Sequence, residues 1–392
     1  MQWLCLTDKS RLLMNNYKVS DLKPGLSCNK PVYIDEETLF IPAGVPIREK
    51  DLSRLDKWGV SEVQSEGMFS ESENEDLLNS RQLWGIPSDK ELSTFYNKTL
   101  DDLDNLFNRI NLMEDINVAE LDRISDKLID TVENKKMQTI RMVLTHNSST
   151  KAMAKSALNT AILTLTIGFA MNRPRPKLLQ LVNGALLHDI GMMRIPEEIK
   201  VKKSGLSSTE MNKLKSHTVF SYQIISKELG YGDTIAQIAL EHHERWDGDG
   251  YPQGKKKDDI LMEARIVSIA DAFEAMVSER PYRNSMIGYE AMKHIISDNS
   301  RKFDPEILRY FIHSMGIYPL GSIVMLNDST VARVIKGNPE APLRPEVITL
   351  IDSTGKEYPG DMGPVLNLLE IKNLFIVKAV DLNSLLLRND TA

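Results

Sequence analysis

The chain has 392 residues, of which 42% are hydrophobic and 26% are charged, and its formal net charge is −7. This length exceeds one ordinary core and predicts about two or three domains, while the negative charge argues against a general binder of nucleic-acid polymers. The two cysteines, Cys5 and Cys28, exclude a disulfide scaffold and favour a reducing compartment. Because the chain has neither a signal-peptide pattern at its start nor about eighteen consecutive apolar residues, we expect a cytoplasmic protein without a membrane span.

Residues 1–67 predict a small mixed α/β module. Residues 32–34 and 39–41 are short β-type runs on either side of an acidic turn, and residues 47–58 carry apolar side chains at helical spacing. Residues 60–63 favour one more short strand. Since no residue of this module carries an obvious chemistry, we interpret it as a packing or sensory module.

Residues 68–86 are expected to form an acidic linker, because residues 70–76 are polar, acidic and poor in apolar side chains. Residues 87–140 then predict a helical connector in which leucines recur at helical spacing. Ser88 and Glu91 have the spacing of a capping box at its start. The apolar faces of this connector suit a homodimer contact, but ordinary packing within a helical bundle explains them equally well.

Residues 141–315 predict a domain of helices, some of which carry ionisable residues among apolar neighbours. The helix expected over residues 176–187 leads directly into His188 and Asp189. A buried His-Asp pair between apolar residues is costly unless it has a partner. This pair is therefore a candidate for chemistry.

Two more helices of this domain are expected to end or begin near histidines. Ser207 and Glu210 predict a capping box for the helix that carries His217. Asp233 is expected to cap the helix that leads to His242.

The stretch of residues 242–252 is the most unusual in the chain. It contains two adjacent histidines, three carboxylates, two glycines and a proline, although histidine accounts for only seven of the 392 residues. Neutral imidazole is the commonest metal ligand in proteins, and carboxylates are suitable co-ligands for a divalent ion. Taken alone, the pair His242 and His243 could instead interact with the dipole at a helix C-terminus.

Asp271 lies between two alanines in the helix expected over residues 261–278, where a buried carboxylate must be paired or bound to a metal ion. Taken singly, Asp271 could cap a helix or pair with an arginine, and His217 could be an ordinary core histidine. Together, six residues supply the donors of a His/carboxylate metal site, and helical bundles gather such ligands from facing helices. They are His188, Asp189, His217, His242, His243 and Asp271.

Beyond residue 315 the pattern changes to β. Residues 323–326, 331–335 and 347–351 are apolar β-type runs separated by turn-rich segments. They predict a small C-terminal β subdomain over residues 316–392. The whole chain is therefore expected to be α+β and predominantly α.

Several motifs resemble those of the HD-GYP family, a branch of the HD-domain metallophosphohydrolases that degrades cyclic di-GMP. The most specific is the sequence His-His-Glu-x-x-Asp-Gly-x-Gly-Tyr-Pro at residues 242–252. The resemblance covers about residues 141–350. The other matching segments are residues 188–191, 271–273, 280–283, 303–305 and 317–322.

The resemblance implies a five-helix HD-type bundle around a cluster of two or three metal ions, usually iron or manganese. The residues that match the ligands of one ion are Asp189, His217, His242 and His243. His188, Asp189 and Asp271 match the ligands of its neighbour, with Asp189 bridging. Two adjacent cations are suited to hold a hydroxide nucleophile and to support in-line displacement at phosphorus.

The resemblance also implies contacts with the substrate. Arg280 and Arg283 match the family's phosphate contacts, and arginine forks suit the phosphodiesters of cyclic di-GMP. Tyr251 lies on the loop beside the site. Asp189 and Tyr251 are accordingly the candidate catalytic residues.

Three positions depart from the family pattern. Ser156 stands where the family has its first histidine, Ala152 where it often has a glutamate ligand, and Met192 where it usually has a lysine. One ion keeps its four expected ligands, whereas the second loses a histidine and a third loses its carboxylate. We therefore expect one or two bound divalent ions, with iron or manganese favoured.

Two functional classes follow from these motifs. The first is a metal-dependent cyclic di-GMP phosphodiesterase of bacterial second-messenger signalling, with weakened activity. The second is a catalytically inactive relative that binds cyclic di-GMP, or a partner protein, through the Gly-Tyr-Pro loop of residues 250–252. The three departures favour the second class, and the intact motifs favour the first.

Overall fold

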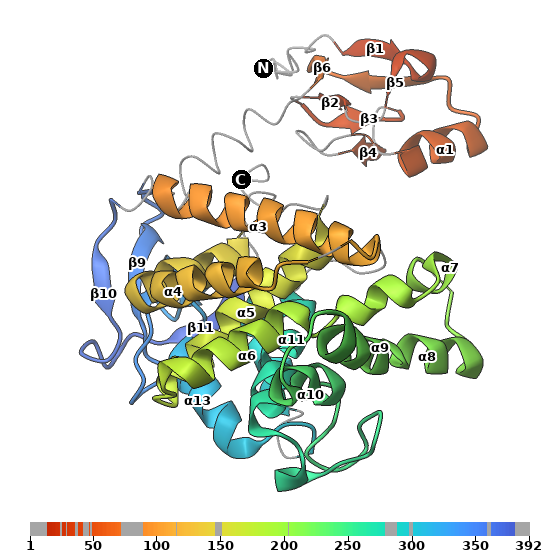
Figure 1. The fold of residues 1–392 in the computed structure, drawn as a ribbon. Coiled ribbons are helices and arrows are strands. Elements are labelled where there is room, and N and C mark those ends of the chain that lie inside the picture. The colour runs from red at the N-terminus through yellow and green to blue at the C-terminus, as the bar shows by residue number, and fades with distance from the viewer. Residues whose placement is uncertain are drawn as a thin grey trace, which may run out of the picture. The chain divides into compact units, whose positions relative to one another are not determined.

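The fold is given by a computed structural model (Figure 1). The residues that it describes are 14–23, 26–28, 30–35, 38–41, 47, 49–71, 89–114, 116–145, 151–202, 204–278, 288–297, 301–358 and 362–380. The chain divides into two compact units, Met1–Gly85 with Asn383–Ala392, and Ile86–Leu382. The finer division into five segments stays a prediction.

The described part of the N-terminal unit combines the helix α1 (Glu49–Lys57) and the short 3-10 helix η1 (Val19–Asp21) with short antiparallel strands. The strands of its four-stranded sheet, in their order across the sheet, are β1 (Asn15–Lys18), β5 (Glu62–Ser65), β3 (Val32–Tyr33) and β4 (Leu39–Ile41). A separate pair is formed by β2 (Leu26–Cys28) and β6 (Phe69–Glu71). Leu55 of α1 and Val63 of β5 are fully buried in the core of this unit. The predicted mixed α/β character is confirmed.

Two long helices, α3 (Lys90–Asn111) and α4 (Ala119–Thr145), open the larger unit. The N-cap of α3 is Asp89, whose carboxylate accepts a hydrogen bond from the backbone N–H of Leu92. The predicted cap with Ser88 is therefore wrong, and Ser88 itself lies outside the described residues. The carboxylate of Asp89 is favoured because Lys135 of α4 lies 3.0 Å from it and because a negative charge stabilises a helix N-terminus.

The centre of the larger unit is a bundle in which α5 packs against α6 and α11, and α10 packs against α6 and α9. These helices are α5 (Ala152–Ala170), α6 (Arg175–Leu187), α9 (His217–Gln223), α10 (Asp233–Glu241) and α11 (Met262–Val277). Their buried side chains form one continuous hydrophobic core. The predicted helical HD-type bundle is confirmed, with α6 and α11 within about one residue of the expected boundaries.

The helix α5 is apolar on nearly all sides. By length and composition alone it could cross a membrane, since an 18-residue stretch of it has a mean hydropathy of 1.2. However, 78% of that stretch is buried inside the protein. Its packing is close, since a Cβ at Gly168 would lie 2.7 Å from a methyl group of Leu178. Burial among neighbouring helices accounts for the apolar composition of α5.

Shorter helices connect the bundle helices. Between α6 and α9 lie η2 (Ile190–Arg194), α7 (Glu197–Lys200) and α8 (Ser208–Lys215), and a π-helical turn, η3 (Ile224–Glu228), follows α9. The predicted capping box of Ser207 and Glu210 is present, but it caps α8, which ends at Lys215, and His217 begins the separate helix α9. The N-cap of α10, however, is Gly232 rather than Asp233. Asp233 is already helical, and its carboxylate accepts a hydrogen bond from the Tyr222 hydroxyl.

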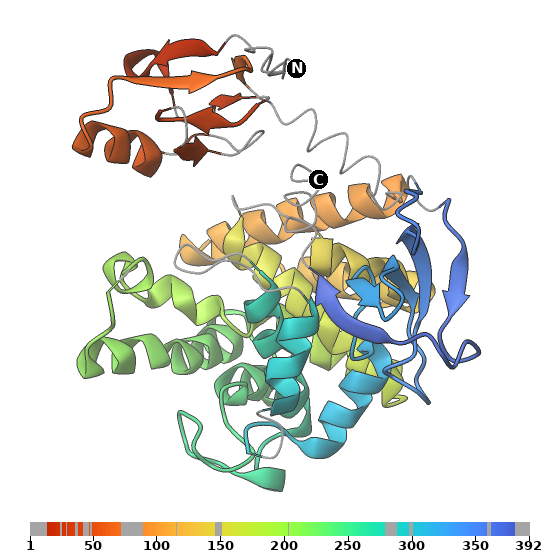
Figure 2. The ribbon, with the colours of Figure 1, turned by 180° about the vertical axis from the view of Figure 1, so that it is seen from behind.

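After α12 (Gly288–Ser297) and α13 (Pro305–Met315), the unit ends in a five-stranded antiparallel sheet at one edge of the helices, opposite α7 and α8 (Figures 1 and 2). Its strands in order are β10 (Val365–Asn367), β9 (Glu346–Ile351), β8 (Val331–Lys336), β7 (Ile323–Leu326) and β11 (Ile376–Val380). The predicted strands β7, β8 and β9 are confirmed. The edge strands β10 and β11 were not predicted, although β11 begins within the apolar run of residues 374–377. None of the side chains of these two strands is fully buried.

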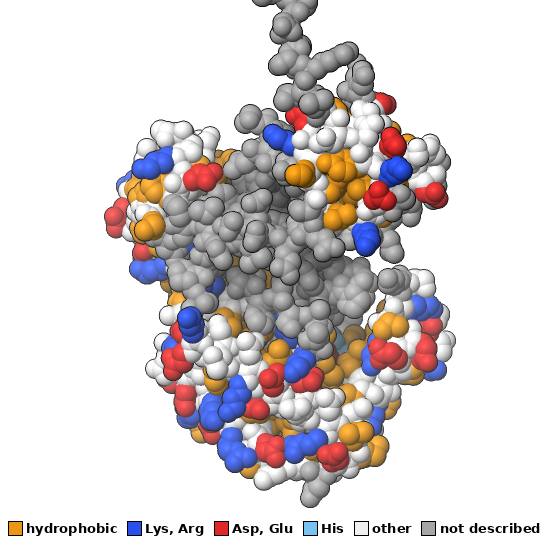
Figure 3. Space-filling view, turned by 90° about the horizontal axis from the view of Figure 1, so that it is seen from above, with side chains coloured by type: hydrophobic (Ala, Val, Ile, Leu, Met, Phe, Trp, Pro, Cys, Tyr) orange, Lys and Arg blue, Asp and Glu red, His pale blue; other side chains and the backbone are white. Residues whose placement is uncertain are grey.

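Charged side chains of both signs are interspersed over the described surface on the face drawn in Figure 3. On this face the described Lys and Arg side chains do not gather into one continuous basic area.

Candidate metal centre and adjoining pocket

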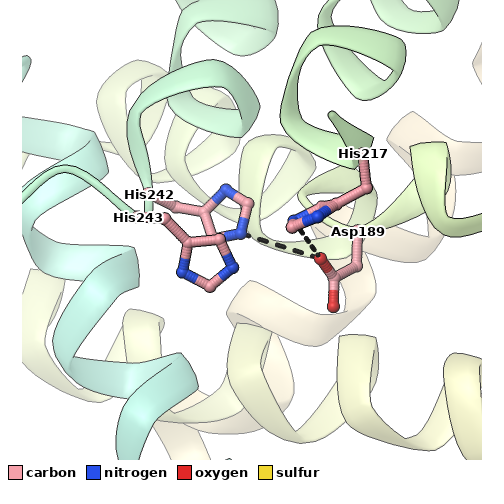
Figure 4. A group of neighbouring side chains, drawn as sticks. All are labelled: Asp189, His217, His242 and His243. Carbon is pink, nitrogen blue, oxygen red and sulfur yellow. Dashed lines mark ion pairs between the residues drawn. The ribbon is translucent and has the colours of Figure 1, made fainter. Parts of the chain in front are cut away.

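Four predicted ligands meet at the ends of three helices (Figure 4). Asp189 directly follows α6 and its C-cap, His217 is the first residue of α9, and His242 and His243 follow the last residue of α10. One ligand atom from each of these four residues lies within 4.8 Å of the others. The helix ends therefore bring together residues that are 54 positions apart in the chain, and the spacing of their donors suits a single ion.

The atoms that face the centre of this group have no hydrogen-bond partner. Within the described residues, Asp189 Oδ1, His217 Nε2 and His242 Nε2 are buried without one. Asp189 Oδ1 lies 3.2 Å from His217 Nε2 and 3.7 Å from His242 Nε2. Leaving buried polar atoms unpaired is costly, and a bound cation would satisfy all of them together. The residues present thus fit a divalent metal ion, as expected for an HD domain.

The orientation of three histidines is set by the backbone of the preceding helical turn. The Nδ1 atoms of His188, His217 and His242 lie 2.7, 2.7 and 2.8 Å from the carbonyl oxygens of Ala185, Leu214 and Ala239. A carbonyl oxygen only accepts, so each Nδ1 carries a hydrogen atom and donates it. The lone pair of each neutral ring is then on Nε2, which is the arrangement that metal-ligating histidines require.

His188 and Asp271 extend the group on its other side. His188 Nε2 lies 3.5 Å from Asp189 Oδ2 and 3.6 Å from Asp271 Oδ1, and it too is buried without a hydrogen-bond partner. Burial lowers the pKa of His188, but the charges of Asp189 and Asp271 outweigh burial and raise it to about 9. Burial raises the pKa of Asp189, but the surrounding histidines hold it well below its usual range.

Gly191 keeps the segment after α6 in contact with α9. A Cβ at this position would lie 2.1 Å from the carbonyl oxygen of His217 and 2.4 Å from the backbone nitrogen of Ser221. The N–H of Gly191 donates a hydrogen bond to Ser221 Oγ at 2.8 Å. Because backbone atoms cannot give way as a flexible side chain can, only glycine permits this approach. The approach positions Asp189 beside His217.

The position of the missing histidine is occupied by a hydrogen-bonded serine. Ser156 Oγ in α5 lies 2.8 Å from Glu274 Oε2 in α11 and donates to it. Glu274 also accepts hydrogen bonds from Ser278 Oγ at 2.6 Å and from Asn159 Nδ2 at 3.4 Å. Asn159 in turn accepts a hydrogen bond from the hydroxyl of Tyr96. These contacts tie α5 to α11 one turn from the predicted ligand on α11.

A cavity of about 550 Å³ adjoins the metal group and includes His243 and Asp271 in its wall. Tyr251 also lines it, and its ring lies 4.8 Å from that of His243. Burial raises the pKa of Tyr251, and the charges of Asp189 and Asp271 raise it further. The phenol therefore keeps its proton at neutral pH and is available as a hydrogen-bond donor to a ligand in the cavity.

Some residues of this wall were not predicted. Lys215, Lys302 and His294 line the cavity, and each belongs to a different part of the sequence. The signals were present, since Lys215 stands two residues before His217 and Lys302 directly precedes the motif at residues 303–305. The predicted phosphate contacts, Arg280 and Arg283, lie outside the described residues.

Two family models match the chain. The model described as "HD domain" matches residues 134–307, and the one described as "KOW domain associated with HD domain" matches residues 323–387. Among solved structures, an HDG"Y"P protein from Bdellovibrio bacteriovorus is 17% identical, with a TM-score of 0.47, and the match covers 76% of this chain and 98% of that chain. A likeness at that level supports no conclusion about function.

Three similar proteins are named as cyclic di-GMP phosphodiesterases. PdeB of Borreliella burgdorferi is 34% identical over 189 residues, 47% of this chain and 50% of that protein. A protein of Thermotoga maritima is 42% identical over 134 residues, 33% and 35% of the two chains. A protein of Pseudomonas aeruginosa is 30% identical over 200 residues, 50% and 48%.

The chain spans half or less of the length of these relatives. The matched part contains all six of the predicted His and Asp ligands. The geometry of the metal group and the family match together identify residues 134–307 as an HD domain.

Proposed function

We propose that this chain is a metal-dependent phosphodiesterase that hydrolyses cyclic di-GMP. The observation that carries the proposal is the set of buried, unpartnered ligand atoms beside a cavity of about 550 Å³. A cavity of that size lies within the range of small-molecule sites. The names of the three relatives support the choice of substrate.

The metal group suits one ion fully and a second ion in part. Asp189, His217, His242 and His243 would hold the first ion, and His188 with Asp271 would join Asp189 at a second. We propose one or two ions of iron or manganese. When bound, such ions supply Lewis-acid polarisation of the phosphoryl group and an activated water.

The side chains around the group have separate roles in this proposal. His188, His217 and His242 present their Nε2 atoms without rearrangement, because the backbone bonds at Nδ1 already orient the rings. Asp189 presents its carboxylate beside them. The protonated phenol of Tyr251 donates to a phosphoryl oxygen. Arg280 and Arg283 bind the phosphates, so replacing either with alanine should weaken cyclic di-GMP binding by about 1.5–3 kcal/mol in calorimetry.

Three further expectations stay predictions. They are a homodimer through residues 87–140, a protein partner at the Gly-Tyr-Pro loop of residues 250–252, and a cytoplasmic location. Sedimentation of the purified protein tests the first of these directly.

The deciding experiment is elemental analysis of the purified protein together with a cyclic di-GMP turnover assay in iron, manganese and zinc. Turnover that depends on one of these metals supports the proposal. Binding of cyclic di-GMP without turnover in any metal would instead indicate the catalytically inactive relative. If the protein neither binds nor hydrolyses cyclic di-GMP in any of these metals, the proposed phosphodiesterase and the inactive relative are both contradicted.

A further inference from the structure

The cations in the wall of the cavity are not equivalent. Arg245 is held by Asp247 through two contacts, Nε to Oδ1 at 3.0 Å and Nη2 to Oδ2 at 2.6 Å. Among the residues that the structure describes, no ion pair joins Lys215 or Lys302 to a carboxylate. Neither amino group is therefore held in an ion pair by a described carboxylate, although Glu244, Asp249 and Asp271 also line the cavity.

Lys215 is the cation that the structure connects to the metal group. Its amino group lies over the ring of Tyr251, 5.0 Å from the ring centre. That ring lies 4.8 Å from the ring of His243 and 6.4 Å from the ring of His217. Tyr251 therefore links Lys215 to two of the ligands, and all but His217 line the same cavity.

The stacking on Tyr251 orients the amino group without cancelling its charge. The attraction of an ammonium to an aromatic face is weak and leaves the positive charge in place, whereas a carboxylate at close range would neutralise that charge. The helix that ends at Lys215 is anchored at its start by the capping box of Ser207 and Glu210, and Glu210 also binds Lys202. A lysine held in this way is oriented and still free to bind an anion.

We propose that Lys215 binds a non-bridging oxygen of the phosphodiester that lies at the metal group, with the ring of Tyr251 as the surface that positions its amino group. The inference rests on the proposed function and names one specific contact for it. A compact ammonium suits a phosphate oxygen, because it offers three donors and a full charge. Lys302 lies over Phe303, and within the described part of the chain no ring contact or ion pair connects it to the ligands, so the assignment is to Lys215 alone.

The test compares Lys215→Met with Lys213→Met in the full chain. Methionine keeps an unbranched side chain over Tyr251 and removes the charge, and Lys213 is an exposed lysine of the same helix that does not line the cavity. We expect Lys215→Met to raise KM and Kd for cyclic di-GMP by roughly 10- to 100-fold, the loss of one charged hydrogen bond, with metal content unchanged. Lys213→Met should behave as wild type, and Lys215→Arg should recover most of the affinity.

The outcomes separate this inference from the proposed function. If wild type neither hydrolyses nor binds cyclic di-GMP in any metal, both are overturned. If wild type works and Lys215→Met matches Lys213→Met, only the assignment of Lys215 is overturned. A loss of bound metal in Lys215→Met would also overturn it, since the lysine would then support the metal group rather than the phosphate.

Discussion

The two sides of the metal centre differ in how their polar atoms are satisfied. On the side formed by the ends of α6, α9 and α10, buried ligand atoms of Asp189, His217 and His242 have no hydrogen-bond partner. On the side formed by α5 and α11, Ser156 and Glu274 are hydrogen-bonded to each other. A cation would stabilise the first side, because no other group in the described protein satisfies these ligand atoms. On the second side, an ion would have to compete with a hydrogen bond that already exists.

The largest expected effect follows from removing a ligand on the side whose buried atoms have no hydrogen-bond partner. His242→Ala removes a ligand of the first ion, and we expect it to strip most of the bound metal. The loss of affinity should exceed the roughly 10–100-fold typical of an outer-shell partner. The control is His313→Ala, because His313 is exposed on α13. Equal metal content in the two variants by elemental analysis would show that the group does not hold the ion.

The second prediction introduces metal ligands on the side formed by α5 and α11. Ser156→His with Met192→Lys should raise cyclic di-GMP hydrolysis severalfold above wild type, because the imidazole replaces a hydroxyl that does not serve a metal well. Adding Ala152→Glu should raise metal content further, since Ala152 is exposed and shares a helix face with Ser156. The risk is overpacking against Glu274. A triple variant that folds, binds two ions and hydrolyses nothing would refute the ligand-deficit explanation.

The third prediction removes the hydrogen bond that satisfies the second side. Ser156→Ala should lower the free energy of unfolding by about 1–2 kcal/mol, because Glu274 loses one of its hydrogen-bond donors while buried. Metal content should not change. Ser226→Ala is the matched control, since Ser226 Oγ donates only to a backbone carbonyl of its own helical stretch. Equal losses for both variants in urea denaturation would mean that the bond to Glu274 adds nothing specific.

The smallest expected effect is the release of a proton from His188 when metal binds. The pKa of His188 is raised to about 9, above the value of about 6.5 for free histidine, by Asp189 and Asp271 against the opposing effect of burial. Its contribution to the stability of the metal-free fold is therefore fully present below about pH 6.5 and is lost as the pH rises through about 9. Metal uptake at pH 7 should displace this proton. Calorimetry in buffers of different ionisation enthalpy should show more proton release at pH 7 than at pH 10, and release independent of pH would contradict the shift.

Local sequence determined much of the helical unit and the identity of the candidate ligands. The expected boundaries of α6 and α11 agree with the structure because helical periodicity and helix-ending residues act within a few positions. The segment of residues 242–252 pointed to a metal site because its histidines and carboxylates stand next to each other in the chain. The strands β7, β8 and β9 could be predicted because each is a continuous apolar run between turn-rich segments.

Tertiary structure decided what depends on segments that are far apart. The bond between Ser156 and Glu274 spans 118 positions, and neither residue by itself indicates the other. The position of Lys215 over Tyr251 likewise results from the packing of α8 against the Gly-Tyr-Pro loop. The cap at Asp89 depends partly on Lys135 of another helix. Periodicity reports which face of a segment is buried, but the partner on the opposite face is selected only when the helices pack and each buried polar atom must find a donor or an acceptor.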